Sequence, residues 1–310
     1  MIKYFIKRIL ILIPILLVVS FLVFCLMSMT GDPARTKAGD FATEEQIEQM
    51  REQMGLNDPI VVRFGRWIKA VVLKGDFGEG LYGDNCWDEF ALRIPHTVKL
   101  AFASIILTVL IAIPFGIIAA VKQNTWIDTI LSSTAMLGIS MPTFWLGLLL
   151  IVLFSVHLKW LPSGGDNGTF LALLMPMFCS AINDAALVTR MTRSSMVDHI
   201  RADYLRTARA KGVSERNVIL KHALKNALVP IITIVGSQFS ILLGGTTVIE
   251  TVFSWPGVGM YTVQCIRSND FMSATCNIVL VSVLTAAVLL AVDMLYAFVD
   301  PRIKARYKRS

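Results

Sequence analysis

The chain has 310 residues, of which 55% are hydrophobic and only 16% are charged, and its mean hydropathy is +0.64. This composition excludes an ordinary soluble domain and favours a protein that lives in a lipid bilayer. The formal net charge is +7. No basic tract is interleaved with aromatic residues, so the charge indicates membrane topology and does not indicate nucleic-acid binding.

Six apolar segments are each long enough to cross a hydrocarbon core, which takes about 20 residues. The first opens with Lys3, Lys7 and Arg8 as a secretory signal does. Its apolar run is too long for a signal and shows no small-residue cleavage site, so we expect a retained anchor. The sequence therefore predicts an all-α membrane protein with six transmembrane helices, at 9–29, 97–121, 129–156, 170–189, 228–248 and 276–299.

The distribution of Lys and Arg predicts the orientation, because basic residues in short flanking segments stay in the cytoplasm. One side holds 18 of them, nine in the insert 190–227, whereas the short loops of the other side hold only Lys159 and Arg267. Both termini are therefore expected in the cytoplasm. The predicted organisation is a first helix (1–29), an extracytoplasmic segment (30–95), a five-helix core (96–299) containing the insert, and a basic tail (300–310).

The extracytoplasmic segment is too short for an independent enzyme domain. Residues 43–54 predict a helix capped by Thr43 and followed by Gly55. Residues 60–73 predict an amphipathic helix that lies on the membrane or on a partner.

Three prolines within the predicted spans, Pro114, Pro142 and Pro176, each remove a backbone donor. They predict that helices two, three and four are kinked or locally unwound, as in a protein whose spans rearrange. The alternative is that prolines are simply commoner in membrane helices than in soluble ones.

The fifth span carries Gly236, Ser240 and Gly244 at four-residue spacing, with Ser237 and Gln238 beside them. Small residues on one helix face indicate close helix packing. The alternative is that this face lines a polar pathway.

Two carboxylates, Asp184 and Asp293, lie inside predicted spans, toward their predicted cytoplasmic ends. A carboxylate in the bilayer is costly and usually functional. We expect interfacial or helix-pairing roles, with a proton or substrate relay as the alternative.

The insert contains an apolar stripe from Val197 to Ala208, with a stop at Gly212. This pattern predicts one helix over that stripe, ended by a left-handed glycine. Ser214 is expected to cap a second helix that enters the membrane at Pro230. The result is a helix-turn-helix elbow. An amphipathic basic helix lying flat on anionic lipid is the alternative, although it requires neither the glycine nor the proline.

The amino-acid sequence of this insert is a specific motif. It reads Arg206-Thr207-Ala208-Arg209-Ala210-Lys211-Gly212, and Leu228-Val229-Pro230 closes it. It resembles the signature of permease subunits of ATP-binding-cassette importers, in the variant used by the dipeptide, oligopeptide and nickel group. Arg206 and Thr207 depart from the Glu and Ala of the general pattern. Matching motifs extend along the chain: Gly31-Asp32-Pro33, Gly75-Asp76-Phe77-Gly78, Ser140-Met141-Pro142, the segment from Glu250 to Gly257, and Asp300-Pro301-Arg302.

The resemblance implies a type I importer permease in a prokaryotic inner membrane, together with a second permease, two ATPase subunits and an extracytoplasmic binding protein. It implies that the ATPase subunits carry ATP and Mg and that this chain is not catalytic and binds no cofactor. No Gly-x-x-x-x-Gly-Lys loop occurs in the sequence. The expected ATPase-coupling residues are Tyr204, Leu205, Arg206, Thr207, Ala208, Arg209, Ala210, Lys211 and Gly212.

The segment containing Glu250, Trp255, Pro256 and Gly257 is expected to form an outer gate or a contact with the binding protein, and otherwise a plain loop. The five cysteines form no Cys-x-x-Cys pair, and Cys86 could pair with Cys265.

A short peptide, glutathione included, is the expected substrate on the resemblance, and nickel or a nickel chelate is the alternative. The four histidines form no ligand cluster in the sequence, so no metal site is expected. From other classes, an ion-coupled secondary transporter and a membrane-embedded hydrolase remain as alternatives.

Overall fold

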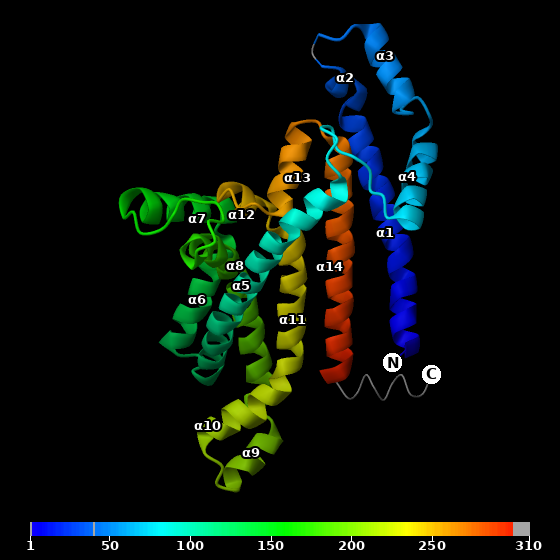
Figure 1. Ribbon diagram of the computed structural model, residues 1–310. Helices are drawn as coiled ribbons and strands as arrows, with labels where there is room; N and C mark the ends of the chain where they lie inside the picture. Colours follow the sequence, from blue (N-terminus) through cyan, green and yellow to red (C-terminus); the bar gives the residue numbers. More distant parts are fainter. Residues whose placement is uncertain (1, 40, 300–310) are drawn as a thin grey trace. The chain divides into compact units, whose positions relative to one another are not determined.

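The computed structural model describes residues 2–39 and 41–299, and the predicted tail 300–310 lies outside them. The described chain is built from helices, with one isolated antiparallel bridge between Glu79 and Asn85. Two compact units divide the fold: one comprises 98–255 and the chain from 287 onward, and the other comprises 2–97 and 256–286. Figure 1 labels the helices of both units.

Five helical segments in the described residues are long and apolar enough to cross a membrane. They are Arg8–Met29, Cys86–Val121, Phe170–Ile200, Glu215–Gly245 and Phe271–Met294. They correspond to α1 (Ile2–Thr30), α5 (Cys86–Val121), α8 (Phe170–Ile200), the run α10 (Glu215–Asn217), η2 (Val218–Ala223) and α11 (Leu224–Gly245), and α14 (Phe271–Val299).

The third predicted span is broken in two. Helices α6 (Trp126–Ser140) and α7 (Thr143–Leu150), the latter continued by η1 (Ile151–His157), meet at 97°. Pro142 has no N–H to donate, and it forces the preceding Met141 into an extended conformation (φ −84°, ψ 124°). The predicted kink or local unwinding at Pro142 is therefore confirmed, and the predicted span 129–156 consists of two helical parts; with this bent pair counted as one span, the described residues contain the six spans that the sequence predicts. By contrast, α5 and α8 continue without interruption past Pro114 and Pro176.

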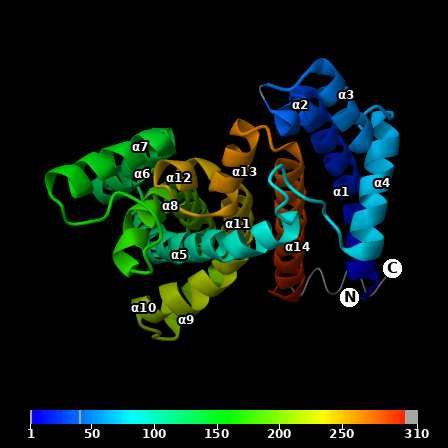
Figure 2. The same ribbon diagram turned by 45° about the horizontal axis from the view of Figure 1, so that its top comes forward.

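The unit that contains the first span joins α1 to three short helices. These are α2 (Pro33–Ala38), α3 (Glu44–Gln53) and α4 (Ile60–Lys74), and α1 and α4 lie side by side in both views (Figures 1 and 2). Thr43 caps α3 in a capping box with Gln46, which confirms the expected helix. Helix α2 was not expected, although Asp32 before Pro33 is a typical helix start.

The other unit is organised around the packing of α8 against α11. Ser195 on α8 donates a buried hydrogen bond to the carbonyl of Ala227 (3.1 Å). Two glycines permit close helix approach: a Cβ at Gly116 would lie 2.5 Å from Thr192 and one at Gly236 would lie 2.4 Å from Val292.

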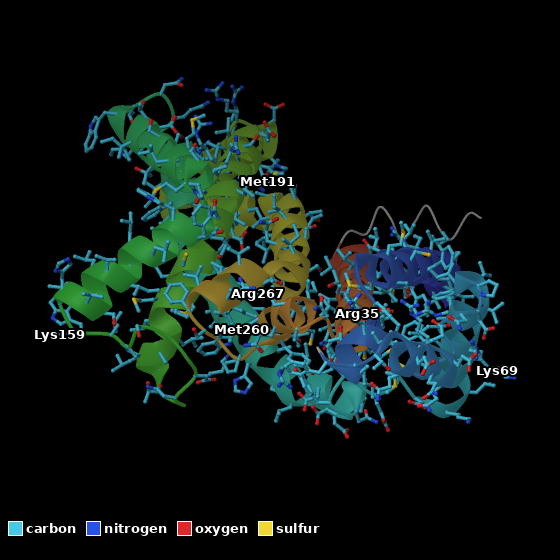
Figure 3. All side chains as sticks on the ribbon, turned by 90° about the horizontal axis from the view of Figure 1, so that it is seen from above. Arg35, Lys69, Lys159, Met191, Met260 and Arg267 are labelled. Carbon is cyan, nitrogen blue, oxygen red and sulfur yellow. The ribbon has the colours of Figure 1, made fainter. Side chains whose placement is uncertain are left out.

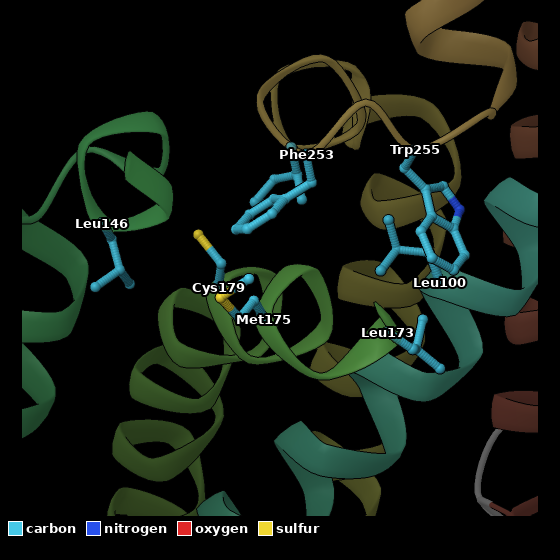
Figure 4. Close-up of a cluster of buried hydrophobic side chains, with 8 residues drawn as sticks. Leu100, Leu146, Leu173, Met175, Cys179, Phe253 and Trp255 are labelled. Carbon is cyan, nitrogen blue, oxygen red and sulfur yellow. The ribbon is translucent and has the colours of Figure 1, made fainter. Parts of the chain in front are cut away.

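A buried hydrophobic cluster lies near each end of this helix pair. The elbow cluster comprises Ala120, Met196, Leu205, Val218, Ala223, Ala227 and Ile231. The tryptophan cluster comprises Leu100, Leu146, Leu173, Met175, Cys179, Ile249, Phe253 and Trp255 (Figure 4).

All five cysteines are free thiols, so the considered pair of Cys86 with Cys265 is not formed. The Cys86 thiol lies 3.7 Å from the Ser273 hydroxyl and packs in one cluster with Cys276.

A buried ion pair, which sequence reasoning did not identify, fixes α6 to α8. Arg193 donates from Nε to Asp128 Oδ1 (2.6 Å) and from Nη2 to Oδ2 (2.7 Å). The Asp128 side chain is only 7% exposed. Its carboxylate also accepts the backbone N–H of Asn124 (3.0 Å).

We expect Arg193→Met to destabilise the solubilised protein by about 3 kcal/mol, because it leaves a buried carboxylate without its cation. Thermal unfolding in detergent measures the change. Arg35→Met is the control, since Arg35 and Glu44 form an exposed pair at 3.9 Å and such pairs contribute little. Equal midpoints for the two variants would contradict the role given to Arg193.

Candidate functional site

The elbow begins with a break in the chain after α8. Helix α8 ends at Ile200, and α9 (Asp203–Ala210) begins after Arg201 and the extended residue Ala202. The expectation of one helix from Val197 to Ala208 was therefore wrong. Val197 and Ile200 belong to α8, and the apolar stripe continues across a turn because both helices pack on the same elbow cluster.

Leu205 anchors α9 to the rest of its unit. Its side chain is 0% exposed and lies in the elbow cluster with Met196 of α8 and Val218 of η2. Of the nine expected coupling residues, Leu205 is thus the one that faces fully inward, and it cannot itself contact a partner. Burying a leucine in this way contributes about 2 kcal/mol.

The turn after α9 is closed by Gly212, whose φ of +75° is left-handed. Its N–H bonds to the Arg209 carbonyl (3.0 Å), and the N–H of Val213 bonds to Ala208 (3.2 Å). This confirms the expected glycine stop. Ser214 precedes α10 but makes no side-chain capping bond, so the expected cap was wrong.

A side-chain ion pair crosses the turn between α9 and α10. Arg209 donates to Glu215 from Nε (3.0 Å) and from Nη2 (2.8 Å). These hydrogen bonds to the carboxylate raise the pKa of Arg209 above its ordinary value. This two-point contact links the last turn of α9 to the first residue of α10.

The opposite face of the elbow is exposed. Tyr204 is 41% exposed, and the Arg206 side chain is 77% exposed. The exposed members of the predicted coupling set are Tyr204, Arg206, Thr207, Ala210, Lys211 and Gly212, which we call the docking face.

The elbow continues directly into a membrane-spanning helix. From Glu215 the chain is helical through α10, η2 and α11 to Gly245. Pro230 lies inside α11 and does not open it, so the helix passes the expected entry point without a break. Helices α9 and α10 lie at one end of the α8–α11 pair, and α7 and α12 (Thr247–Val252) lie at the other (Figure 1).

The small and polar residues of α11 lie in different environments. Gly236 meets Val292, and Ser240 is buried and bonded to the Gly236 carbonyl (3.1 Å), which is helix packing. Gly244 is exposed and Ser237 is half-buried. Gln238 is buried and donates to Asp184 Oδ1 of α8 (2.6 Å). Asp184 therefore pairs helices, as expected.

The expected outer gate is largely buried. Glu250 and Trp255 are each 0% exposed, and Thr246 donates to Glu250 Oε1 (3.0 Å). The turn lies at Ser254, where φ is +49°, and the Trp255 N–H bonds back to the Glu250 carbonyl (2.8 Å). Both side chains fill the protein interior, so neither is placed to contact a binding protein, and the role of this segment as an outer gate stays a prediction.

Pro256 is half-buried and Gly257 is buried, where the chain enters α13 (Val258–Arg267). They lie in the other compact unit. Among the described residues, no three His, Cys, Asp or Glu side chains gather in a way that could hold a metal ion.

Comparison with known proteins identifies the family. The model of binding-protein-dependent transport system inner membrane components matches residues 112–305, and the model of its N-terminal part matches residues 1–89. The glutathione transport system permease protein GsiC of Escherichia coli K12 is 44% identical over 310 residues, covering 99% of this chain and 100% of that protein. The protein of the same name from Shigella flexneri serotype 5b is 43% identical over the same coverage.

A solved structure has the same fold at lower identity. The inward-facing MetNI methionine ABC transporter matches 68% of this chain and 96% of its own, with a TM-score of 0.60 and 18% identity. The all-helical architecture is that of a type I importer permease. The chain therefore belongs to the family of binding-protein-dependent transport system inner membrane components, as a multi-pass permease subunit of an ATP-binding-cassette importer.

Proposed function

We propose that this subunit pairs with a second, similar permease to form a path for short peptides, and that two ATPase subunits drive it through the elbow. The observation that carries the proposal is the division of α9 into two faces. Leu205 is fully buried, while the docking face is free to meet a partner. A helix that packs on its own subunit with one face and is exposed on the other can transmit a displacement of its partner to the rest of the subunit.

The elbow faces the cytoplasm in this proposal, and so do both chain termini. The nine basic residues of the insert support this orientation. The partner ATPase subunits bind ATP and Mg, and an extracytoplasmic binding protein delivers the substrate. Closure of the ATPase pair moves α9, and the continuous helix from Glu215 to Gly245 carries that motion into the membrane.

Charge reversal on the docking face tests the ATPase contact. We expect Arg206→Glu and Lys211→Glu each to weaken recovery of co-purified ATPase subunits by about tenfold, since interface charges set partner recognition. Lys159→Glu is the matched control, because Lys159 follows η1 and is not part of the elbow. Undiminished recovery with both docking-face variants would contradict the proposal.

Substitutions at Gly212, the left-handed residue of the turn, test coupling separately from docking. A Cβ at Gly212 would meet nothing within 4 Å in this chain, so within the subunit a substitution acts through the backbone, and the Asn variant below controls for a side chain added to the docking face. We expect Gly212→Val to strain the turn by about 1–3 kcal/mol and to uncouple ATP hydrolysis from uptake. Gly212→Asn should retain both activities, because Asn tolerates this conformation. Normal uptake by a correctly inserted Gly212→Val variant would contradict the proposed role of this turn in coupling.

Short peptides, glutathione included, are the proposed substrates, because relatives named for glutathione transport match the whole chain. Membership of the family leaves the secondary transporter and the hydrolase without support. Cells relying on this importer should take up labelled glutathione or dipeptide, and deleting the gene should abolish that uptake. Uptake of nickel alone would favour the metal-chelate alternative.

A further inference from the structure

A cavity of about 350 Å³ lies within the unit that contains the first span. It is bounded by the end of α1, by α4 and by the start of α14, and the chain around Gly55 closes it. All of these belong to one compact unit. None of the functional residues described above lines this cavity.

The cavity presents positive charge. Arg63 and Arg66 line it, and no Asp or Glu does. Arg66 is paired with Asp58. Arg63 has no carboxylate within ion-pair distance among the described residues, and its guanidinium lies over the Phe24 ring, 5.7 Å from the centroid.

Arg63 is also half-buried. Burial, and then the positive charge of Arg66, lower the pKa of Arg63 below its ordinary value, yet a guanidinium stays charged in proteins. A ring face compensates the charge of a cation only in part. Asp58 is near enough to act on the pKa of Arg63 in the opposite direction, but it is paired with Arg66, so Arg63 has no carboxylate of its own in the cavity.

The remaining walls are mainly apolar. Met27, Trp67, Phe271 and Met272 are among the lining residues, Ser28 and Thr275 are the uncharged polar ones, and the Trp67 indole N–H is already bonded to the Phe77 carbonyl (3.1 Å). The cavity opens beside the last turns of a membrane span. Only 11% of the apolar window of α1 is buried within the chain, and Val18 and Leu22 are exposed there.

These observations call for a ligand with one anionic head and an apolar tail, at the depth where a span meets water. We propose that this cavity binds an anionic glycerophospholipid, whose phosphodiester contacts Arg63 and whose acyl chains run from the apolar wall along α1. Basic pockets beside membrane helices recognise lipid head groups in this way. A free phosphate could bind Arg63, but it would leave the apolar walls of the cavity without an apolar partner. A zwitterionic head would bring an ammonium group beside two arginines, in a cavity that no carboxylate lines.

Native mass spectrometry of the full chain, purified with the subunits that assemble with it and then delipidated, tests the proposal. Phosphatidylglycerol is added back, with phosphatidylethanolamine and inorganic phosphate as separate probes. We expect a phosphatidylglycerol adduct that Arg63→Gln reduces about fivefold, given the usual contribution of one basic residue to anionic lipid binding. Arg63→Lys should keep most of the adduct.

Two further variants separate the lipid site from general effects. Lys69→Gln removes a charge from the same helix but not from the cavity (Figure 3), and it should leave the adduct unchanged. Met27→Trp keeps the charge but fills the cavity, so it should reduce the adduct even if Arg63→Gln fails to fold. Equal adducts in every variant, displacement by phosphate alone, or a wild-type complex that binds no phosphatidylglycerol would each overturn the proposal.

Discussion

The burial of Leu205 is the contact on which the geometry of the elbow, and with it the proposed coupling, depends. A short helix of eight residues from Asp203 to Ala210 has little stability of its own. Packing in the elbow cluster holds it against the end of α8 and the start of the α10–α11 run. Without that anchor, a force on the docking face would only displace α9. With it, the same force reaches two membrane helices at once.

Buried polar contacts then make α8 and α11 move together. The Ser195 hydroxyl bonds to the Ala227 carbonyl near the elbow, and Gln238 bonds to Asp184 farther along. In an apolar interior each such bond is costly to break, because the freed groups find no water. Sliding one helix past the other would break both bonds. The pair is therefore suited to move as a rigid body.

Features that depend on neighbouring residues were predicted correctly from the sequence. Features that depend on residues far apart in the chain were not. Span lengths follow from hydropathy, and the Thr43 cap and the Gly212 stop follow from local backbone chemistry. Pro142 was recognised, but a proline does not reveal whether it bends a helix or divides it, as it does here. Trp255 looked like an exposed loop residue. Its burial arises from α5, α7 and α8, which no pattern around position 255 encodes.

The buried Trp255 gives the far end of the helix pair its own rigidity. The tryptophan cluster joins α8 to the chain that leaves α11 through α12. Gly164 also lies so close to the Phe253 backbone that a Cβ there would be 2.2 Å from its carbonyl oxygen. Such close packing resists continuous deformation. Both ends of the α8–α11 pair are therefore held by buried clusters, which is the rigidity that the proposed transmission of motion from α9 requires.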